Sequence, residues 1–307
     1  MERVTADLAV QLGPLSLKNP ILTASGTFGY GLEFTDFVDL ACLGGICTKG
    51  LSLNPHAGNV PPRICETPAG MLNAIGLQNV GIEAFLTEKL PKLKEIGVTV
   101  IANVWGDLEE DYVTVVQALE GAEGLAAVEL NISCPNVEKG GMLFGNSPGL
   151  TASLVARVRR ATRRPLIVKL SPNAPDLVES ARAARDAGAD VLSLVNTFVG
   201  MAIDPETGRP LLSFGTGGLS GPAIKPLAVR MVYQVAKALP GVPLMGIGGI
   251  SSLADVLEFL AAGATAVQIG TANFRDPGIS GRLVRELETS CRERGVTPSS
   301  ITGRALR

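Results

Sequence analysis

Residues 126–170 read AAVELNISCPNVEKGGMLFGNSPGLTASLVARVRRATRRPLIVKL and contain one complete strand, helix and strand pattern. The runs Ala126–Ile132 and Pro165–Leu170 are short and mainly apolar, and Thr151–Ala161 between them has the spacing of an amphipathic helix. Short apolar runs separated by helices indicate parallel strands that are covered on both faces. This stretch therefore predicts an α/β fold.

The same unit recurs along the chain. Six further runs are expected as strands: Pro20–Ser25, Gly45–Lys49, Thr99–Trp105, Ala189–Val195, Val242–Ile247 and Thr265–Gly270. Helical spacing is found in six further intervals: Val80–Ile96, Leu108–Leu119, Pro175–Ala187, Ala223–Leu239, Leu253–Ala262 and Arg282–Arg292. Eight expected strands with helices between them favour a closed (β/α)₈ TIM barrel over an open doubly wound sheet, although periodicity alone does not prove closure.

Two features concern the domain organisation. The alternation of Leu8, Val10 and Leu12 predicts a short N-terminal β-hairpin ahead of the barrel. A chain of 307 residues fits one large barrel or two ordinary domains. Because no Gly/Ser linker or low-complexity segment marks a boundary, we expect one domain over residues 1–307.

Charge and cysteine content exclude several functions. The 27 basic and 29 acidic side chains give a net charge of −2, which offers no basic surface for nucleic acid or an anionic membrane. The opening MERVTADLAVQLGPL does not resemble a signal peptide, and no apolar run approaches a membrane span, so we expect a soluble, cytoplasmic protein. Five scattered cysteines and the single His56 predict neither a disulfide scaffold nor a metal site.

Polar residues gather where the expected strands end. In a barrel these ends meet at one mouth, where enzymes of this fold place their active sites. One such residue is read most simply as an ordinary start of a loop, whereas the whole set indicates a site. The set consists of Ser25, Lys49, Asn103, Asn131, Lys169, Asn196 and Thr197.

Loops at the same mouth supply further signals. The connections Gly50–Gln78 and Asn196–Pro222 are unusually long, and Pro135–Gly149 is a third loop on this face. After the seventh and eighth strands stand GIGGI (246–250) and Gly270–Thr271. Glycines after these two strands, with a helix following each stretch, are typical of a phosphate site in a barrel.

Three side chains at the mouth carry groups that are suited to binding or catalysis. Lys49 and Lys169 are each suited to neutralise an anion, to stabilise charge on a reduced ring or to form a Schiff base, but each also fits a solvated position on the rim. Cys134 stands between the carboxamides of Asn131 and Asn136, and its thiol is suited to act as a general base. The other four cysteines are read as small core residues.

Seven short motifs follow one another along nearly the whole chain: TKG (48–50), NAIGLQN (73–79), NISCPN (131–136), IVKLSPN (167–173), VNT (195–197), LSGPAIKP (219–226) and GIGGI (246–250). Together they resemble the dihydroorotate dehydrogenase family, the flavin enzymes of pyrimidine biosynthesis. The combination is far more specific than any single motif. The resemblance implies a (β/α)₈ barrel with FMN at the carboxyl ends of its strands.

The resemblance also implies roles for individual residues. Cys134 would remove a proton from C5 of dihydroorotate while a hydride leaves C6 for the flavin. FMN would contact Ser25, Lys49, Gly50, Asn103, Asn131, Lys169, Val195, Gly221, Gly248, Gly249, Gly270 and Thr271. The substrate would be held by Lys49, Asn73, Ala74, Ile75, Gly76, Leu77, Asn131, Asn136, Asn196 and Thr197.

The segments TASGTFGYG (23–31) and VEKGGMLFG (137–145) resemble the NAD-linked group of this family, class 1B. That group pairs its catalytic subunit with an electron-transfer subunit that carries FAD and a [2Fe-2S] cluster, which implies a heterotetramer with two copies of each. Three alternatives stay open at this point: the fumarate-linked class 1A enzyme, another FMN barrel that reduces a pyrimidine, and a Schiff-base aldolase that uses Lys169.

Overall fold

Eight parallel strands close into a barrel in the computed structural model, which describes residues 6–132 and 141–307. Around the barrel the strands follow the order β10-β13-β14-β3-β4-β7-β8-β9, and β9 pairs with β10 to close the ring. Each strand lies within a run expected from the sequence or differs from it by one residue, so the predicted barrel is confirmed. The strands are β3 (Ile21–Thr23), β4 (Gly45–Cys47), β7 (Val100–Val104), β8 (Leu125–Asn131), β9 (Leu166–Lys169), β10 (Val191–Leu194), β13 (Leu244–Ile247) and β14 (Ala266–Ile269).

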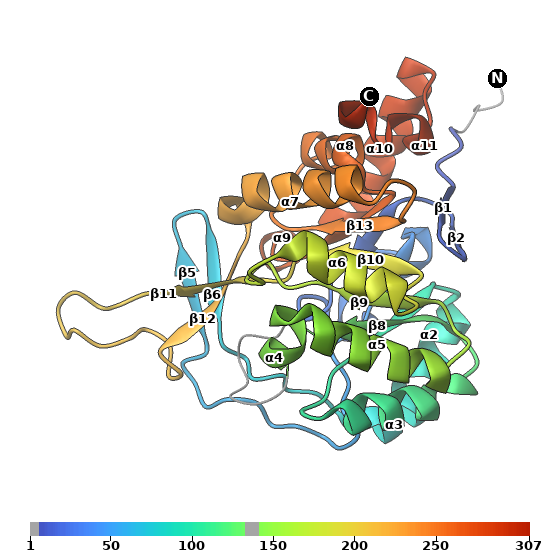
Figure 1. Cartoon of the computed structure of the whole chain (residues 1–307). Helices are drawn as coiled ribbons and strands as arrows, with labels where there is room; N and C mark the ends of the chain where they lie inside the picture. Colours follow the sequence, from blue (N-terminus) through green and yellow to red (C-terminus); the bar gives the residue numbers. More distant parts are fainter. Residues whose placement is uncertain (1–5, 133–140) are drawn as a thin grey trace.

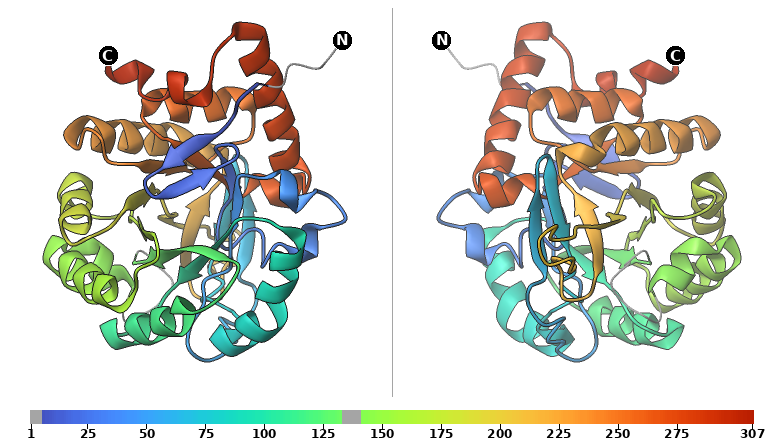
Figure 2. Two further views of the ribbon diagram at one scale, coloured as in Figure 1. Left: turned by 90° about the vertical axis from the view of Figure 1, so that its right-hand side faces the viewer. Right: turned by 90° about the vertical axis from the view of Figure 1, so that its left-hand side faces the viewer.

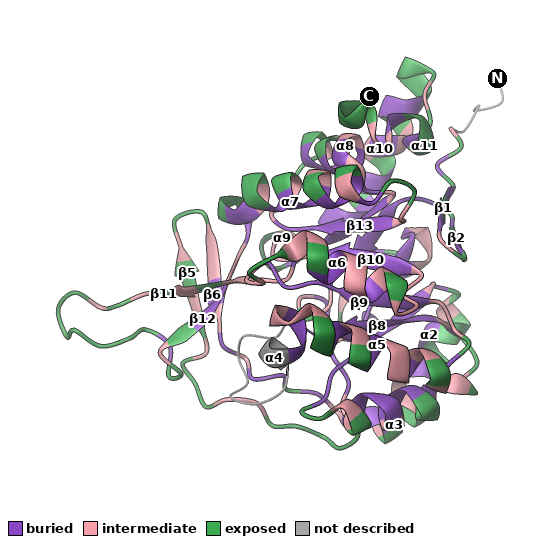
Figure 3. Cartoon of the chain, in the orientation of Figure 1, coloured by how far each residue is buried: buried purple, intermediate pink, exposed green. Residues whose placement is uncertain are grey.

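Helices surround the barrel, and the longer ones, α3, α5, α7, α8 and α10, each bury one face (Figures 1 and 3). In α7, for example, buried residues recur every three or four positions from Ala228 to Ala236, which is the spacing of one helical face. The helices are α1 (Gly81–Ala84), η3 (Phe85–Lys89), α2 (Leu90–Ile96), α3 (Glu109–Glu120), α4 (Gly141–Asn146), α5 (Pro148–Ala161), α6 (Leu177–Asp186), α7 (Lys225–Ala238), α8 (Leu253–Ala262), α9 (Ala272–Arg275), α10 (Ile279–Arg294) and α11 (Pro298–Ile301), with the short turns η1 (Leu32–Phe34), η2 (Leu40–Cys42), η4 (Pro222–Ile224) and η5 (Arg304–Leu306). Within the described residues no helix is both long and apolar enough to cross a bilayer.

The predicted N-terminal hairpin is present as β1 (Val10–Leu12) and β2 (Leu15–Leu17). Its buried leucines and valine pack in one apolar cluster with Leu22, Ile101 and Ile167 from three barrel strands. The hairpin crosses in front of the strands in the left view of Figure 2. It therefore covers one end of the barrel, and the opposite end is left for a ligand.

The two long connections are not simple loops, which corrects the expectation from the sequence. They contain the strands of a second, antiparallel sheet, ordered β11-β12-β6-β5, which projects beside the barrel in Figure 1. These strands lack a clear apolar alternation, and the pairing of β6 with β12, which joins the two connections, brings together segments far apart in the chain. They are β5 (Ile64–Thr67), β6 (Gly70–Asn73), β11 (Phe198–Met201) and β12 (Thr216–Ser220).

Candidate active site

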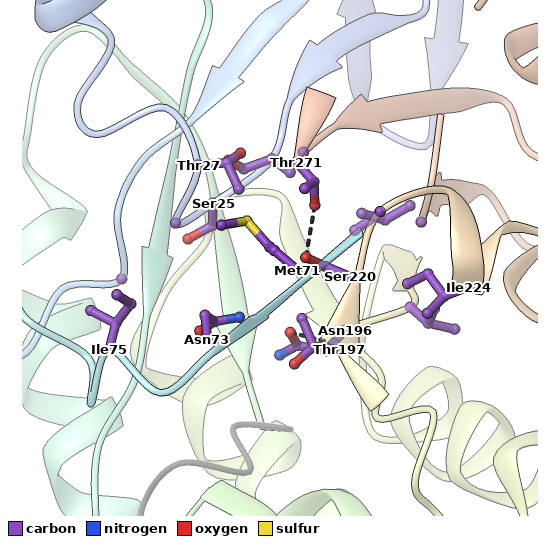
Figure 4. A pocket seen from close by; sticks show the side chains of 18 of the residues that line it. Ser25, Thr27, Met71, Asn73, Ile75, Asn196, Thr197, Ser220, Ile224 and Thr271 are labelled. Atoms are coloured by element: carbon purple, nitrogen blue, oxygen red, sulfur yellow. Dashed lines mark hydrogen bonds between the residues drawn. The ribbon is translucent and has the colours of Figure 1, made fainter. Parts of the chain in front are cut away.

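A pocket opens at the carboxyl ends of the barrel strands, and the second sheet forms one of its walls (Figure 4). It brings together side chains from both ends of the sequence, as expected for this face of a barrel. Of the residues predicted for the site, the pocket is lined by Ser25, Lys49, Gly50, Asn73, Ile75, Gly76, Leu77, Asn131, Lys169, Val195, Asn196, Thr197, Gly221, Gly248, Gly249, Gly270 and Thr271.

Four predicted site residues are not among those lining the pocket. Cys134 and Asn136 lie outside the described residues. Ala74 is fully buried in a small apolar cluster. Asn103 is also fully buried, and a Cβ built on Gly50 would lie 2.9 Å from its Oδ1. Asn103 therefore stands directly behind the pocket wall, and its predicted contact with a cofactor stays a prediction.

The most informative side chain in the pocket is Lys169. It is only 5% exposed, it lines the pocket, and it makes no hydrogen bond or ion pair with any residue in the described part of the chain. The alternative of a solvated lysine on the rim is therefore wrong for Lys169. A buried ammonium group without a partner is costly, so this position fits a ligand that presents an anionic or electron-rich edge.

Carboxamide and hydroxyl groups line another part of the pocket. Asn73 extends from β6 towards Asn196 and Thr197, which follow β10 (Figure 4). The Asn196 amide donates to Oδ1 of Asn131 at 3.1 Å, and the Asn73 amide donates to the Gly218 carbonyl oxygen at 3.1 Å. These contacts fix the orientation of the amides. The arrangement suits a small planar ligand with several amide-like edges.

Glycines form a tight cradle at the end of the pocket beside β13. Gly249 has φ +72°, and a Cβ there would lie 2.7 Å from the Gly221 carbonyl oxygen. Gly248 has φ +133°, and a Cβ there would lie 2.7 Å from the Cβ of Ala228. Only glycine fits both the backbone conformation and the space. Both glycines line the pocket, and main-chain N–H groups at such a turn are suited to bind a phosphate.

Asp255 holds this cradle in place. Its carboxylate accepts hydrogen bonds from the backbone N–H groups of Ser251 and Ser252, both at 2.9 Å, and from Nζ of Lys225 at 2.8 Å. Burial by itself raises the pKa of Asp255, but the bonds from Lys225 and the serines hold the pKa below its ordinary value. The charged carboxylate thus ties the loop after β13 to the start of α8.

The structure adds site residues that the sequence analysis missed. Glu129 is fully buried inside the barrel, beneath the pocket residues Asn131 and Lys169. A signal was present, since a glutamate within an apolar strand and two positions before Asn131 must face the barrel interior. Other missed residues stand in motifs already recognised, such as TASGTFGYG and LSGPAIKP. The further lining residues are Ala24, Gly26, Thr27, Ile64, Met71, Ser220, Ile224, Ile247 and Phe274.

Comparison with known proteins agrees with this geometry. The family model for dihydroorotate dehydrogenase matches residues 7–290, which is most of the chain. The chain belongs to the dihydroorotate dehydrogenase family. The resemblance found in the motifs is thereby confirmed, and the chain is an oxidoreductase of a family that generally depends on a flavin.

Individual relatives specify a branch of the dihydroorotate dehydrogenase family. A protein of Citrifermentans bemidjiense is 57% identical over 282 residues, 92% of each chain. One from Geobacter sp. strain M21 is 55% identical over 298 residues, 97% of each chain, and one from Geobacter sulfurreducens is 56% identical over 290 residues, 94% of this chain and 95% of the relative. All three are named dihydroorotate dehydrogenase B (NAD(+)), catalytic subunit. Those names imply a separate partner subunit for these relatives.

Proposed function

We propose that this chain is the catalytic subunit of an NAD-linked dihydroorotate dehydrogenase, which oxidises (S)-dihydroorotate to orotate in the biosynthesis of pyrimidines. The observation that carries the proposal is the buried Lys169, which has no hydrogen-bond or ion-pair partner among the described residues and shares one pocket with the glycine cradle and the carboxamides. The names of the relatives favour the NAD-linked enzyme over the fumarate-linked alternative. Membership of the family leaves the aldolase reading without support.

The residues present fit FMN as the cofactor. The glycines at 221, 248 and 249 line the pocket and suit its phosphate, because main-chain N–H groups of a glycine turn can bind phosphate oxygens. Lys169 suits the electron-rich edge of its ring, and the chemistry that FMN supplies when bound is acceptance of a hydride. The proposed binding residues are those expected from the resemblance: Ser25, Lys49, Gly50, Asn103, Asn131, Lys169, Val195, Gly221, Gly248, Gly249, Gly270 and Thr271.

The substrate side of the pocket is proposed to hold dihydroorotate through Lys49 and the carboxamides. Lys49 supplies a positive charge for the substrate carboxylate, and the amides of Asn73 and Asn196 match its ring edges. Cys134 is proposed as the general base that takes the proton from C5. Asn136 and the loop Asn73–Leu77, with Asn131 and Thr197, complete the proposed substrate site.

The route of the electrons requires a second protein. We propose a partner subunit that carries FAD and a [2Fe-2S] cluster and passes electrons to NAD⁺, in a heterotetramer with two copies of each subunit. The term catalytic subunit in the names of the relatives supports such a partner. A cytoplasmic location and a single domain over residues 1–307 belong to the same proposal.

The test is the visible spectrum of the purified protein under anaerobic conditions, before and after addition of dihydroorotate. We expect the purified protein to contain a bound flavin, and we expect the visible absorbance of that flavin to bleach when dihydroorotate is added. A flavin that stays oxidised would overturn the assigned substrate, and a folded protein that binds no FMN would overturn the assigned cofactor.

A further inference from the structure

The barrel interior holds a polar cluster directly beneath the pocket, centred on Glu129 of β8. Its carboxylate accepts four hydrogen bonds from four other strands of the barrel. Oε1 accepts from the Cys47 thiol at 3.2 Å and from Nδ2 of Asn103 at 2.7 Å. Oε2 accepts from Oγ of Ser193 at 2.8 Å and from Nε2 of Gln268 at 2.9 Å. All five residues are 1% exposed or less.

This pattern is the one that an ionised carboxylate makes. Each carboxylate oxygen accepts two bonds, and the amide groups of Asn103 and Gln268 act only as donors here. The Cys47 thiol is a donor as well, because burial and the nearby charge of Glu129 raise its pKa well above the ordinary value. The four donors thus suit the ionised form of Glu129, a negative charge inside the barrel.

A buried charge needs a countercharge, and Lys169 is the one that the structure offers. Among the described residues, the buried charged side chains are Glu129, Lys169 and Asp255, and Asp255 already pairs with Lys225. Lys169 lies on β9, beside β8. On its other side it is paired with Ser193 of β10, which donates a hydrogen bond to Glu129. Glu129 and Lys169 also act on the Cys47 thiol in opposite directions, since the charge of Glu129 raises the pKa of that thiol and the charge of Lys169 lowers it.

Glu129 also determines which atom Asn103 presents to the pocket wall. Because the carboxylate takes the amide Nδ2 of Asn103, the carbonyl Oδ1 is directed elsewhere and has no partner among the described residues. That oxygen lies behind Gly50, which lines the pocket. A glutamine at position 129 would offer an NH₂ group in place of one acceptor and would remove this constraint.

We propose that Glu129 is a positioning residue of the flavin site: its carboxylate balances the charge of Lys169 and holds the Asn103 amide with its oxygen towards Gly50. The inference rests on the proposed function, because it gives the pair a role beneath a flavin ring. The positive charge of Lys169 favours the negative charge that the ring would gain on reduction, and the negative charge of Glu129 opposes it. The pair thereby sets how easily the bound flavin is reduced.

The first test is the midpoint potential of bound FMN in Glu129→Gln, which has the same shape without the charge. We expect the equilibrium constant for two-electron reduction to rise at least tenfold, a shift of about 30 mV to more positive potential. Ser193→Ala is the matched control, because it removes one donor to Glu129 and keeps the charge. An unchanged or lower potential in Glu129→Gln, or an equal shift in Ser193→Ala, would overturn the proposal.

The second test needs no cofactor. It also remains informative if the Glu129→Gln variant is too unstable for a measurement of the flavin potential. Thermal unfolding of the full-length apoprotein is compared for Glu129→Gln, Lys169→Met and the double variant. If the two charges balance each other, the double variant loses much less stability than the sum of the single losses. Additive losses would overturn the charge balance. This result is independent of FMN, so it separates a failure of this inference from a failure of the proposed function.

Discussion

Cys134 follows the last residue of β8 by three positions, and that last residue, Asn131, lines the pocket. The strand therefore delivers the chain to the pocket just before the cysteine. Cys134 itself lies outside the described residues, so its role as general base stays a prediction. It is also the site residue whose replacement distinguishes chemistry from binding most directly.

We expect Cys134→Ser to bind FMN normally and to slow the reduction of the flavin by dihydroorotate by several orders of magnitude near neutral pH. A thiol has an ordinary pKa of about 8.5, whereas a serine hydroxyl is a far weaker acid and a poorer base without help. Anaerobic stopped-flow absorbance measures the rate. Cys42→Ser, a change next to α10 and away from the pocket, is the control. Equal rates in Cys134→Ser and the wild type would remove Cys134 from the mechanism.

At the scale of elements, the antiparallel sheet gives the pocket its substrate wall. The strands β6 and β12 come from two separate connections and pair through Asn73 and Gly218. Gly218 also lies very close to Thr197 on the barrel rim, because a Cβ on Gly218 would lie 2.0 Å from Oγ1 of Thr197. Gly218 is thus the point at which the sheet and the barrel rim meet.

We expect Gly218→Ala to weaken the binding of orotate by about tenfold or more, because the new methyl group displaces Thr197 and shifts the partner of Asn73. The melting temperature should change little, since the barrel does not depend on this contact. A titration of the oxidised flavin spectrum with orotate measures the affinity. Gly121→Ala, at the end of α3 with no atom within 4 Å of the added Cβ, is the matched control. Equal affinities for Gly218→Ala and the control would contradict this role.

At the scale of the whole molecule, the chain is expected to perform only half of the overall reaction. Its relatives are named as catalytic subunits of an NAD(+)-linked enzyme, which implies a separate partner subunit for those relatives. The proposed substrate and cofactor positions share one pocket of this chain. Reduction of the flavin and reduction of NAD⁺ should therefore separate when the subunits are separated.

We expect the isolated chain to be reduced by dihydroorotate and to form NADH at a negligible rate. Addition of the electron-transfer subunit should restore NADH formation, measured by absorbance at 340 nm. The same subunit without this chain is the control for background activity. Rapid NADH formation by the isolated chain would contradict the proposed division of labour.

The sequence alone predicted the barrel, its hairpin and most of the pocket. Strands such as Pro165–Leu170 are apolar throughout because helices cover both faces of the sheet, and that local pattern needs no knowledge of distant residues. Because the carboxyl ends of all barrel strands meet at one mouth, residues such as Lys49, Asn131 and Lys169 were expected together. The motifs added the family, which the comparisons confirmed.

Only the tertiary structure decided the second sheet and the cluster around Glu129. Asn73 and Gly218 pair across 145 positions of the chain, and neither strand has an apolar pattern that predicts its partner. The four donors to Glu129 come from four different strands, so the sequence shows the glutamate but does not reveal the donors that surround it. Local periodicity determines which segments form the barrel strands and the helices around them. Closure of the barrel determines which buried polar groups satisfy one another, because their partners are supplied by the fold and not by neighbours in the chain.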